Sequence, residues 1–247
     1  TDEELDFLSL CVNNGISLAI AGSTGSGKTT DLSYLIECLD VDKRVYTIED
    51  TRELNIAKLN DKGIMENRVV QTVTKDGVNP ISMDDLLKEA LRFHPDVIIP
   101  AEMRGGEALT AVEAGRTGHT IISTRHANSA IDAYNRILSM CVSTGVRLSE
   151  NKLLEFILEA MPLVLFKRQL PDGRRIYDEI FEGIRLEDGR IIGKTLYKYE
   201  IKENIYGDDG KIVKVVGEHT RKNKMSDTLL ARLKYGGASN EMLKEFM

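Results

Sequence analysis

The sequence is poor in cysteine, and no two cysteines have the C-x-x-C spacing of a zinc or redox motif. The three thiols belong to Cys11, Cys38 and Cys141, which lie far apart in apolar or helical surroundings. This use of cysteine predicts reduced core residues of a cytosolic protein rather than a metal or redox site.

Long apolar runs are missing as well. None approaches the roughly 18 to 20 residues of a membrane span, and no signal-peptide pattern opens the sequence. We therefore predict a cytoplasmic protein that has no membrane span of its own, so that any membrane association must come through partner proteins.

The sequence also lacks an excess of basic residues, because 33 Lys and Arg stand against 39 Asp and Glu, for a formal net charge of −6. Proteins that hold nucleic acid by overall electrostatics usually carry a basic face, so strong nucleic-acid binding is not expected, although a local basic channel stays open. At 247 residues, 42% of them hydrophobic, the chain is long enough for a full α/β core and a smaller appended piece.

A phosphate-loop motif stands between an apolar run at 16–21, typical of a buried strand, and a helical pattern at 30–39. It matches G-x-x-x-x-G-K-[ST] without a mismatch. Its glycines let backbone N–H groups turn toward phosphate oxygens, and the helix N-terminus adds to the attraction. The alternative is a glycine-rich turn with a surface lysine. The predicted nucleotide-binding residues are Gly22, Ser23, Thr24, Gly25, Ser26, Gly27, Lys28, Thr29 and Thr30.

Two further apolar runs end in carboxylates, at Glu49-Asp50 and at Glu102. The carboxyl ends of parallel strands border the ligand crevice of an α/β sheet, and an acidic residue ~70 positions after the loop lysine fits the group that holds Mg²⁺ or its water shell. The alternative for Glu49 and Asp50 is the start of a solvated loop. Pro100 removes a ladder donor from the second run, so strand pairing stops there or the ladder breaks locally.

His119 and His126 lie at the two ends of a further apolar strand at 120–124, and a structural role is the alternative for each. After residue 162 the pattern changes to hairpins, with turn signals at 171–173, 188–189 and 208–210. We predict an α/β core with a mostly parallel sheet over residues 1–182, followed by an antiparallel β extension with C-terminal helices over 183–247.

Four blocks in the sequence agree in type, order and spacing with a known family. They are residues 22–29, 47–54, 92–108 and 117–129, which contains His126. Together they resemble the type II/type IV secretion ATPase superfamily, most closely its archaeal and tight-adherence pilus branch, the CpaF-like ATPases. The resemblance covers residues 5–182. It implies a RecA-like P-loop NTPase core that hydrolyses ATP with Mg²⁺ as a subunit of a ring-shaped homo-hexamer. Such motors power pilus assembly, secretion or conjugative transfer together with inner-membrane platform or secretion-channel proteins.

The resemblance also implies roles for individual residues. Lys28 and Thr29 bind phosphate and Mg²⁺, Glu49 activates the attacking water, and Glu102 orients the Mg²⁺ shell. His126 senses the γ-phosphate, and Arg104 and Arg116 form an intersubunit charge relay. The sequence departs from the family pattern at three positions, which bear on the geometry of the second acidic element: Pro100, Ala101 where a glycine is usual, and Arg125 where an apolar residue is common.

The family's N-terminal domain, which supplies arginines to the nucleotide pocket, is not recognised in a sequence that begins at Thr1, and we interpret the sequence as an excised fragment. Because an arginine finger is worth about 10³ to 10⁵ in rate, we expect the chain alone to bind ATP weakly and to hydrolyse it slowly. Three alternatives stay open: a nucleotide-gated docking module with weak hydrolysis, a RecA-like nucleic-acid motor, and a GTPase or small-molecule kinase. A GTPase is disfavoured because residues 151–154 lack the aspartate of N-K-x-D.

Overall fold

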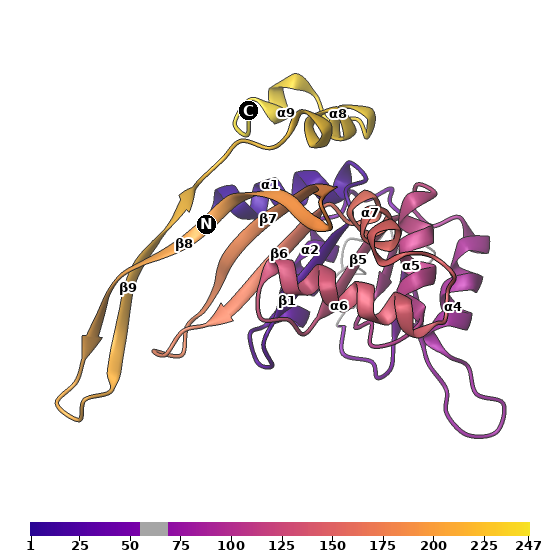
Figure 1. Ribbon diagram of the computed structural model, residues 1–247, viewed down its shortest axis with the longest axis horizontal. Helices are drawn as coiled ribbons and strands as arrows, with labels where there is room; N and C mark the ends of the chain where they lie inside the picture. Colours follow the sequence, from indigo (N-terminus) through magenta and orange to yellow (C-terminus); the bar gives the residue numbers. More distant parts are fainter. Residues whose placement is uncertain (55–68) are drawn as a thin grey trace.

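The computed structural model describes residues 1–54 and 69–247. Within these residues the strands form one nine-stranded sheet in the order β3-β2-β4-β5-β1-β6-β7-β8-β9 (Figure 1). The parallel strands are β1 (Leu18–Gly22), β2 (Val45–Glu49), β3 (Val69–Val73), β4 (Val97–Pro100), β5 (Thr120–Arg125) and β6 (Leu163–Gln169). The antiparallel strands are β7 (Arg175–Glu187), β8 (Arg190–Tyr206) and β9 (Ile212–Arg221). The predicted α/β class, with a mostly parallel sheet and antiparallel strands after it, is confirmed.

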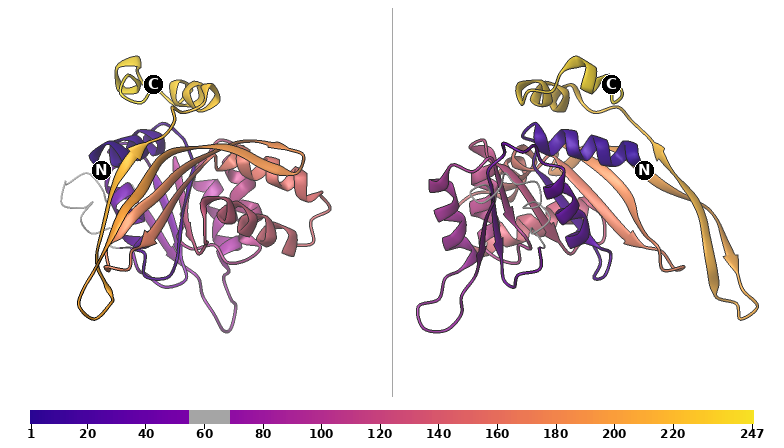
Figure 2. Two further views of the ribbon diagram at one scale, coloured as in Figure 1. Left: turned by 60° about the vertical axis from the view of Figure 1, so that its left-hand side comes forward. Right: turned by 180° about the vertical axis from the view of Figure 1, so that it is seen from behind.

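Helices cover both faces of the sheet (Figure 2). One face carries α4 (Met83–Ala90) with the 3₁₀ turn η1 (Leu91–Phe93), α5 (Glu107–Arg116), α6 (Ala130–Ser143) and α7 (Glu150–Ala160). The other carries α1 (Asp2–Asn13), α2 (Lys28–Glu37), α8 (Asp227–Tyr235) and α9 (Asn240–Leu243). None of these helices in the described part of the chain combines the length and the apolar character that crossing a bilayer demands.

The continuous apolar run of β1 reflects its burial on both faces. Ala19 packs into the hydrophobic cluster under α5 and α6, whereas Leu18 and Ile20 pack into the cluster under α1 and α2. Successive side chains of a strand point to opposite faces, so a strand between two helical layers needs apolar residues at every position. This burial fixes β1, and therefore the loop that follows it, in the middle of the sheet.

The carboxyl ends of β1, β2, β4 and β5 meet at one edge of the sheet. The parallel register places Ala21 opposite Arg125, and Ile48 opposite Pro100. Between β4 and β5 the ladder covers only Val97 and Ile98 and resumes at a single bridge from Glu102 to Thr124. The interruption predicted from Pro100 is therefore confirmed, and beyond it the chain turns Glu102 toward the loop after β1.

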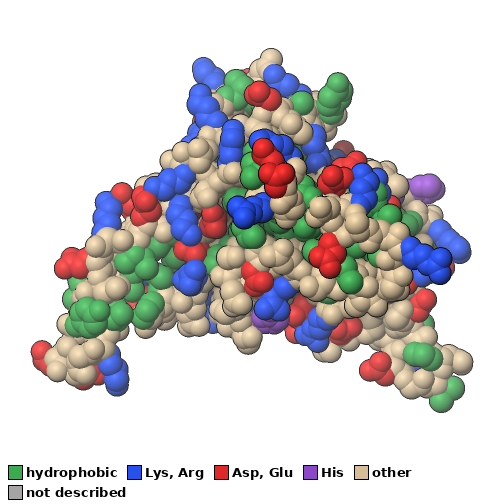
Figure 3. Space-filling view, in the orientation of Figure 1, with side chains coloured by type: hydrophobic (Ala, Val, Ile, Leu, Met, Phe, Trp, Pro, Cys, Tyr) green, Lys and Arg blue, Asp and Glu red, His purple; other side chains and the backbone are tan. Residues whose placement is uncertain are grey.

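The β8–β9 hairpin with its turn, residues 190–221, is called the arm here. It extends away from the helical layers, and hydrophobic side chains gather on its surface (Figures 1 and 3). Its exposed apolar residues are Ile201, Ile205, Tyr206 and Val213. The predicted division between residues 182 and 183 falls inside β7, and the sheet continues across it. Whether the parts on either side are separate domains stays a prediction.

The turn between β6 and β7 fastens the arm to the core. The backbone N–H of Val215 donates to Asp172 Oδ2 at 2.8 Å, and Arg174 donates to the Val215 carbonyl and pairs with Asp172. An apolar cluster supports this contact and consists of Leu170, Ile176, Tyr199 and Val215. Because both backbone polar groups of Val215 are occupied, the edge strand β9 is capped at this point against pairing with another strand.

This contact predicts a local effect at Asp172. The hydrogen bonds from Arg174 and from the Val215 backbone lower the pKa of Asp172 from 3.8 to about 2. Its contribution to stability is therefore complete above pH 3.8 and is lost as the pH falls through about 2. At pH 7 we expect Asp172→Asn to speed amide hydrogen exchange at Val215 roughly tenfold, measured by NMR.

The control for this prediction is Asp209→Asn, because Asp209 lies in the turn of the arm and bonds only to Lys211 among the described residues. We expect Asp209→Asn to leave exchange at Val215 unchanged. Equal exchange at Val215 in the wild type and in Asp172→Asn would show that the turn does not hold the arm.

Candidate nucleotide-binding site

The loop between β1 and α2 has the backbone of a phosphate cradle. Gly22, Gly25 and Gly27 have φ of +155°, +76° and +85°. A Cβ on Gly22 would lie 2.5 Å from the Lys167 carbonyl oxygen, so only glycine fits there. Gly27 caps α2 without a side-chain hydrogen bond, which leaves the first N–H groups of the helix available to an anion.

Two side chains of the loop are buried donors. Lys28 is 8% exposed, and its Nζ donates to the carbonyls of Gly22 at 3.1 Å and Ser23 at 2.9 Å. Burial lowers the pKa of Lys28, and this effect is larger than that of the nearby Glu102 charge, which raises it. Ser26 Oγ is buried and has no hydrogen-bond partner within the described residues. A phosphate oxygen in the loop would satisfy Ser26 and would attract Lys28 away from the two carbonyls.

Glu102 brings a carboxylate to the same edge of the sheet. Arg104 Nη2 donates to its Oε2 at 2.7 Å, and His126 Nε2 lies 3.3 Å from its Oε1. Burial raises the pKa of Glu102, but the hydrogen bond and charge of Arg104, with the charges of His126 and Lys28, outweigh burial and lower it overall. Glu102 is therefore ionised at neutral pH. It lines one pocket of about 120 Å³ together with Thr29, Glu49 and Arg104.

Glu49 lies in this pocket wall and is engaged with its own chain. Its Oε1 accepts from the backbone N–H groups of Glu53 at 2.8 Å and Leu54 at 2.9 Å, and its Oε2 accepts from Gln71 Nε2 at 2.8 Å. A carboxylate has about four lone-pair positions, and the described residues occupy three of them. The side chain of Glu49 thus fastens the segment after β2 beside the cleft.

The residues at this edge fit a magnesium nucleotide. The loop offers backbone N–H groups and the donors of Ser26 and Lys28, while the Thr29 hydroxyl and the Glu102 carboxylate share the adjoining pocket. Within residues 1–54 and 69–247, no group of three or more His, Cys, Asp or Glu is arranged to hold a metal by itself. Mg²⁺ keeps several waters and is bound through one or two protein oxygens and the substrate's phosphates, and the oxygens of Thr29 and Glu102 would supply the protein's part.

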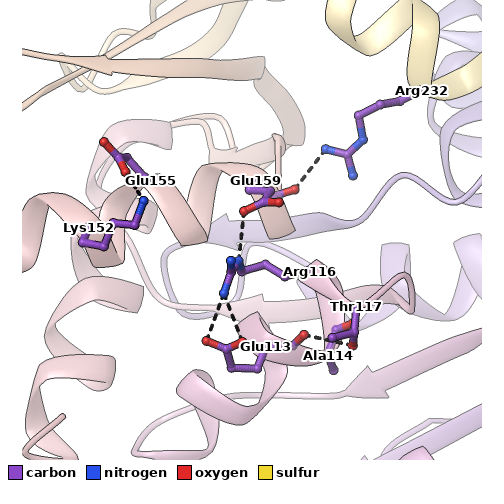
Figure 4. Close-up of polar contacts among 8 residues, drawn as sticks. All are labelled: Glu113, Ala114, Arg116, Thr117, Lys152, Glu155, Glu159 and Arg232. Carbon is purple, nitrogen blue, oxygen red and sulfur yellow. Dashed lines mark hydrogen bonds and ion pairs between the residues drawn. The ribbon is translucent and has the colours of Figure 1, made fainter. Parts of the chain in front are cut away.

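The structure brings Glu49, Glu102, Arg104 and His126 to the loop, but it places Arg116 elsewhere. Arg116 ends α5, roughly 15 Å along the helix from its first residue. There its Nε donates to Glu159 at 2.9 Å and its Nη1 bonds to Glu113 (Figure 4). Its guanidinium stacks 3.4 Å from the centroid of Phe156. Arg116 therefore belongs to an α5–α7 network, and its role in an intersubunit relay stays a prediction.

His119 also lies away from the cleft, because β5 separates it from His126. His126 follows the carboxyl end of β5, whereas His119 precedes its amino end and lies with Nδ1 3.3 Å from the Ala114 carbonyl oxygen.

Sequence reasoning missed the residues that hold the loop from the β6–β7 side. Lys167 is buried, donates to the Gly27 carbonyl at 3.1 Å and pairs with Asp31, which also accepts from the Tyr177 hydroxyl at 3.1 Å. The only local signal was a lysine directly after the apolar run of β6. Its partner on α2 could be found only from the pairing of β1 with β6.

The glycine loop after a central parallel strand, with an acidic residue after a second strand at the same edge, defines a P-loop NTPase fold. The family model described as "Type II/IV secretion system protein" matches residues 1–171. The chain belongs to this family.

Individual relatives agree with the family assignment. The type IV secretion system protein PtlH of Bordetella pertussis is 40% identical over 138 residues, which are 56% of this chain and 40% of PtlH. The protein VirB11 of Rhizobium radiobacter is 31% identical over 198 residues, 77% of this chain and 54% of VirB11. The crystal structure of the VirB11 ATPase of Brucella suis, in complex with sulphate, superposes with a TM-score of 0.64 at 27% identity, covering 73% of this chain and 52% of that one. The chain thus spans about half the length of the relatives it matches.

Proposed function

We propose that the protein is an ATPase that drives secretion, pilus assembly or conjugative transfer. The observation that carries this proposal is the convergence of Lys28, Thr29, Glu102 and His126 at one edge of the sheet. Phosphoryl transfer needs positioning and charge neutralisation more than covalent help, and a lysine, a metal, a carboxylate and a cation provide them. The relatives named for type IV secretion support the same reading.

In this proposal the loop and Lys28 hold the β- and γ-phosphates, and the Thr29 hydroxyl and Glu102 face the metal. Mg²⁺, when bound, neutralises charge that develops on the transferred phosphoryl group. Glu102 is kept ionised by Arg104 and His126, so it orients water around the metal across the neutral pH range.

Glu49 supplies the carboxylate that activates the attacking water, because it lines the same pocket as Thr29 and Glu102. His126 reports the γ-phosphate to Glu102, because its Nε2 lies 3.3 Å from that carboxylate. Arg104 is exposed beside the same cleft and is suited to a charge relay with a neighbouring subunit.

The working form is a homo-hexamer in the cytoplasm, attached to the cytoplasmic membrane through platform or channel proteins. Its subunits carry the family's N-terminal domain, and residues 1–182 form the RecA-like core with 183–247 as its extension. Membership of the CpaF-like branch, the hexamer and these partners are parts of the proposal, supported by the family assignment.

One observation favours a second candidate, a nucleotide-gated docking module. Glu102 is held by Arg104 and His126, and Pro100 interrupts the ladder beside it, so the acidic element could be fixed for binding rather than hydrolysis. The two candidates differ in whether turnover is needed for transport.

Two measurements test the proposal. The first compares phosphate release by the full-length protein in Mg²⁺ and in EDTA. The second compares transport in cells that carry the wild type with transport in cells that carry a hydrolysis-deficient variant. Mg²⁺-dependent release of phosphate, and loss of transport without hydrolysis, are the expected results. Transport that continues without hydrolysis would favour the docking module and would overturn the motor.

A further inference from the structure

An arginine from outside the sequence motifs lies against the phosphate loop. Arg175, the first residue of β7, donates from Nε to the Gly25 carbonyl at 2.7 Å. Its Cδ lies 3.3 Å from the position that a Cβ on Gly27 would occupy. The two contacts hold its guanidinium over the loop, although 150 residues separate Arg175 from Gly25 in the sequence.

Arg175 differs from the other basic residues of the β6–β7 hairpin because its guanidinium is not paired with a carboxylate of the described residues. Arg168 is paired with Asp178, Arg174 with Asp172, and Lys167 with Asp31. Arg175 is exposed, and among residues 1–54 and 69–247 it forms no ion pair and its two Nη groups have no hydrogen-bond partner. Two parallel N–H donors on a planar cation match the oxygens of a phosphate, which they bind in a bidentate manner.

The sheet order indicates which phosphate this arginine meets. Glu102 and His126 follow β4 and β5 on one side of β1, whereas Arg175 comes from the β6–β7 side. Thr29 and Glu102 line one pocket, and a metal held by them would neutralise the terminal phosphates, which would then lie toward β4 and β5. The rest of the phosphate chain would extend over the loop toward β6 and β7, which makes the α-phosphate the group nearest Arg175.

We infer that Arg175 binds the α-phosphate of the nucleotide held by the loop. This inference rests on the proposed function, because it needs a nucleotide in the 22–29 loop. It adds a second cationic wall to the site, supplied by the β6–β7 hairpin within the same chain. The site then favours a ligand with at least two linked phosphates over a single phosphate, because only such a ligand fills the loop and reaches Arg175 at once.

Lys167 does not fit this role, although it lies equally close to the loop. Its ammonium is buried, pairs with Asp31 and donates to the Gly27 carbonyl, so its charge is already neutralised within the protein. Lys167 therefore positions the start of α2, and of these two residues Arg175 is the one that has no ion pair within the described part of the chain and can meet a ligand.

The test measures the affinity of full-length protein for Mg-ADP and for inorganic phosphate, whose single phosphate fills the loop without reaching Arg175, by calorimetry. The variants are Arg175→Ala, Arg175→Lys and the control Arg168→Ala. Arg168 points to the opposite face of the hairpin, and its partner Asp178 keeps Lys198 at 3.3 Å. We expect Arg175→Ala to weaken Mg-ADP binding roughly 10- to 100-fold and to leave the binding of inorganic phosphate unchanged. Arg175→Lys keeps the positive charge but loses the two parallel N–H donors, so its affinity for Mg-ADP should lie between those of the wild type and Arg175→Ala. Arg168→Ala should bind both ligands as the wild type does.

Two results would overturn the inference while leaving the nucleotide site intact. One is wild-type Mg-ADP affinity in Arg175→Ala. The other is an equal loss of Mg-ADP and inorganic phosphate binding in both Arg175 variants, which indicates that the arginine only supports the loop. Failure of the proposed function is seen separately, as wild-type protein that does not bind Mg-ADP or that binds it equally well after Lys28→Ala.

Discussion

Lys28→Ala should lower the rate of ATP hydrolysis by about 10² to 10³ and weaken nucleotide binding, because it removes the buried cation of the phosphate loop. In the folded chain Lys28 Nζ lies on the carbonyls of Gly22 and Ser23, within the electrostatic field of Glu102. The lowered pKa of Lys28 reflects the cost of keeping this charge buried, a cost that a polyphosphate offsets. Phosphate release and calorimetric titration with Mg-ATP measure the two effects.

The control for this prediction is Lys152→Ala, on α7. Lys152 is half-exposed and pairs with Glu155 at 2.8 Å, far from the loop. It should hydrolyse and bind ATP as the wild type does. Wild-type turnover in Lys28→Ala would show that ATP is hydrolysed somewhere other than in the 22–29 loop.

Glu102→Gln should lower hydrolysis by about 10² to 10⁴ while ATP still binds, because the variant loses the charged group beside the metal and its water. The side chain is partly exposed, so the melting temperature should change little. Because the pKa of Glu102 lies below its usual 4.5, its charge is present above that value and is lost only at more acid pH. The rate should therefore not decline through this group between pH 8 and pH 5.

Glu155→Gln is the matched control for this substitution, and it should change neither rate nor binding. Glu49→Gln separates the two carboxylates. It places an amide donor against Gln71 or against the backbone of residues 53 and 54, so stability should fall by about 1 to 3 kcal/mol together with the rate. Near-normal hydrolysis in Glu102→Gln, with loss only in Glu49→Gln, would show that Glu102 has no part in turnover.

Much of the site could be predicted from the sequence, because its parts are local. The glycines, Lys28 and Thr29 form one continuous motif, and Glu49 and Glu102 follow apolar runs whose parallel pairing brings their ends together. The break in the β4–β5 ladder could be predicted from Pro100, because proline has no N–H to donate.

The remaining features depend on strand order, which no local pattern encodes. The Lys167 contact with Gly27 joins residues 140 positions apart and exists only because β6 pairs with β1. Arg116 shows the converse case. It directly precedes the block at residues 117–129, but α5 carries it across the sheet to Glu159, and its role in an intersubunit relay stays a prediction. Arg116 therefore lies next to a motif in the sequence without lying at the phosphate loop in the structure.

The central claim is that the 22–29 loop and Glu102 together hold Mg-ATP. A structure of the full-length protein with Mg²⁺ and a non-hydrolysable ATP analogue tests it most directly. We predict the β- and γ-phosphates within the loop, Lys28 transferred from the Gly22 and Ser23 carbonyls to phosphate oxygens, and the metal between Thr29 and Glu102. Phosphates bound outside the loop, or Lys28 still on both carbonyls with the nucleotide present, would contradict it.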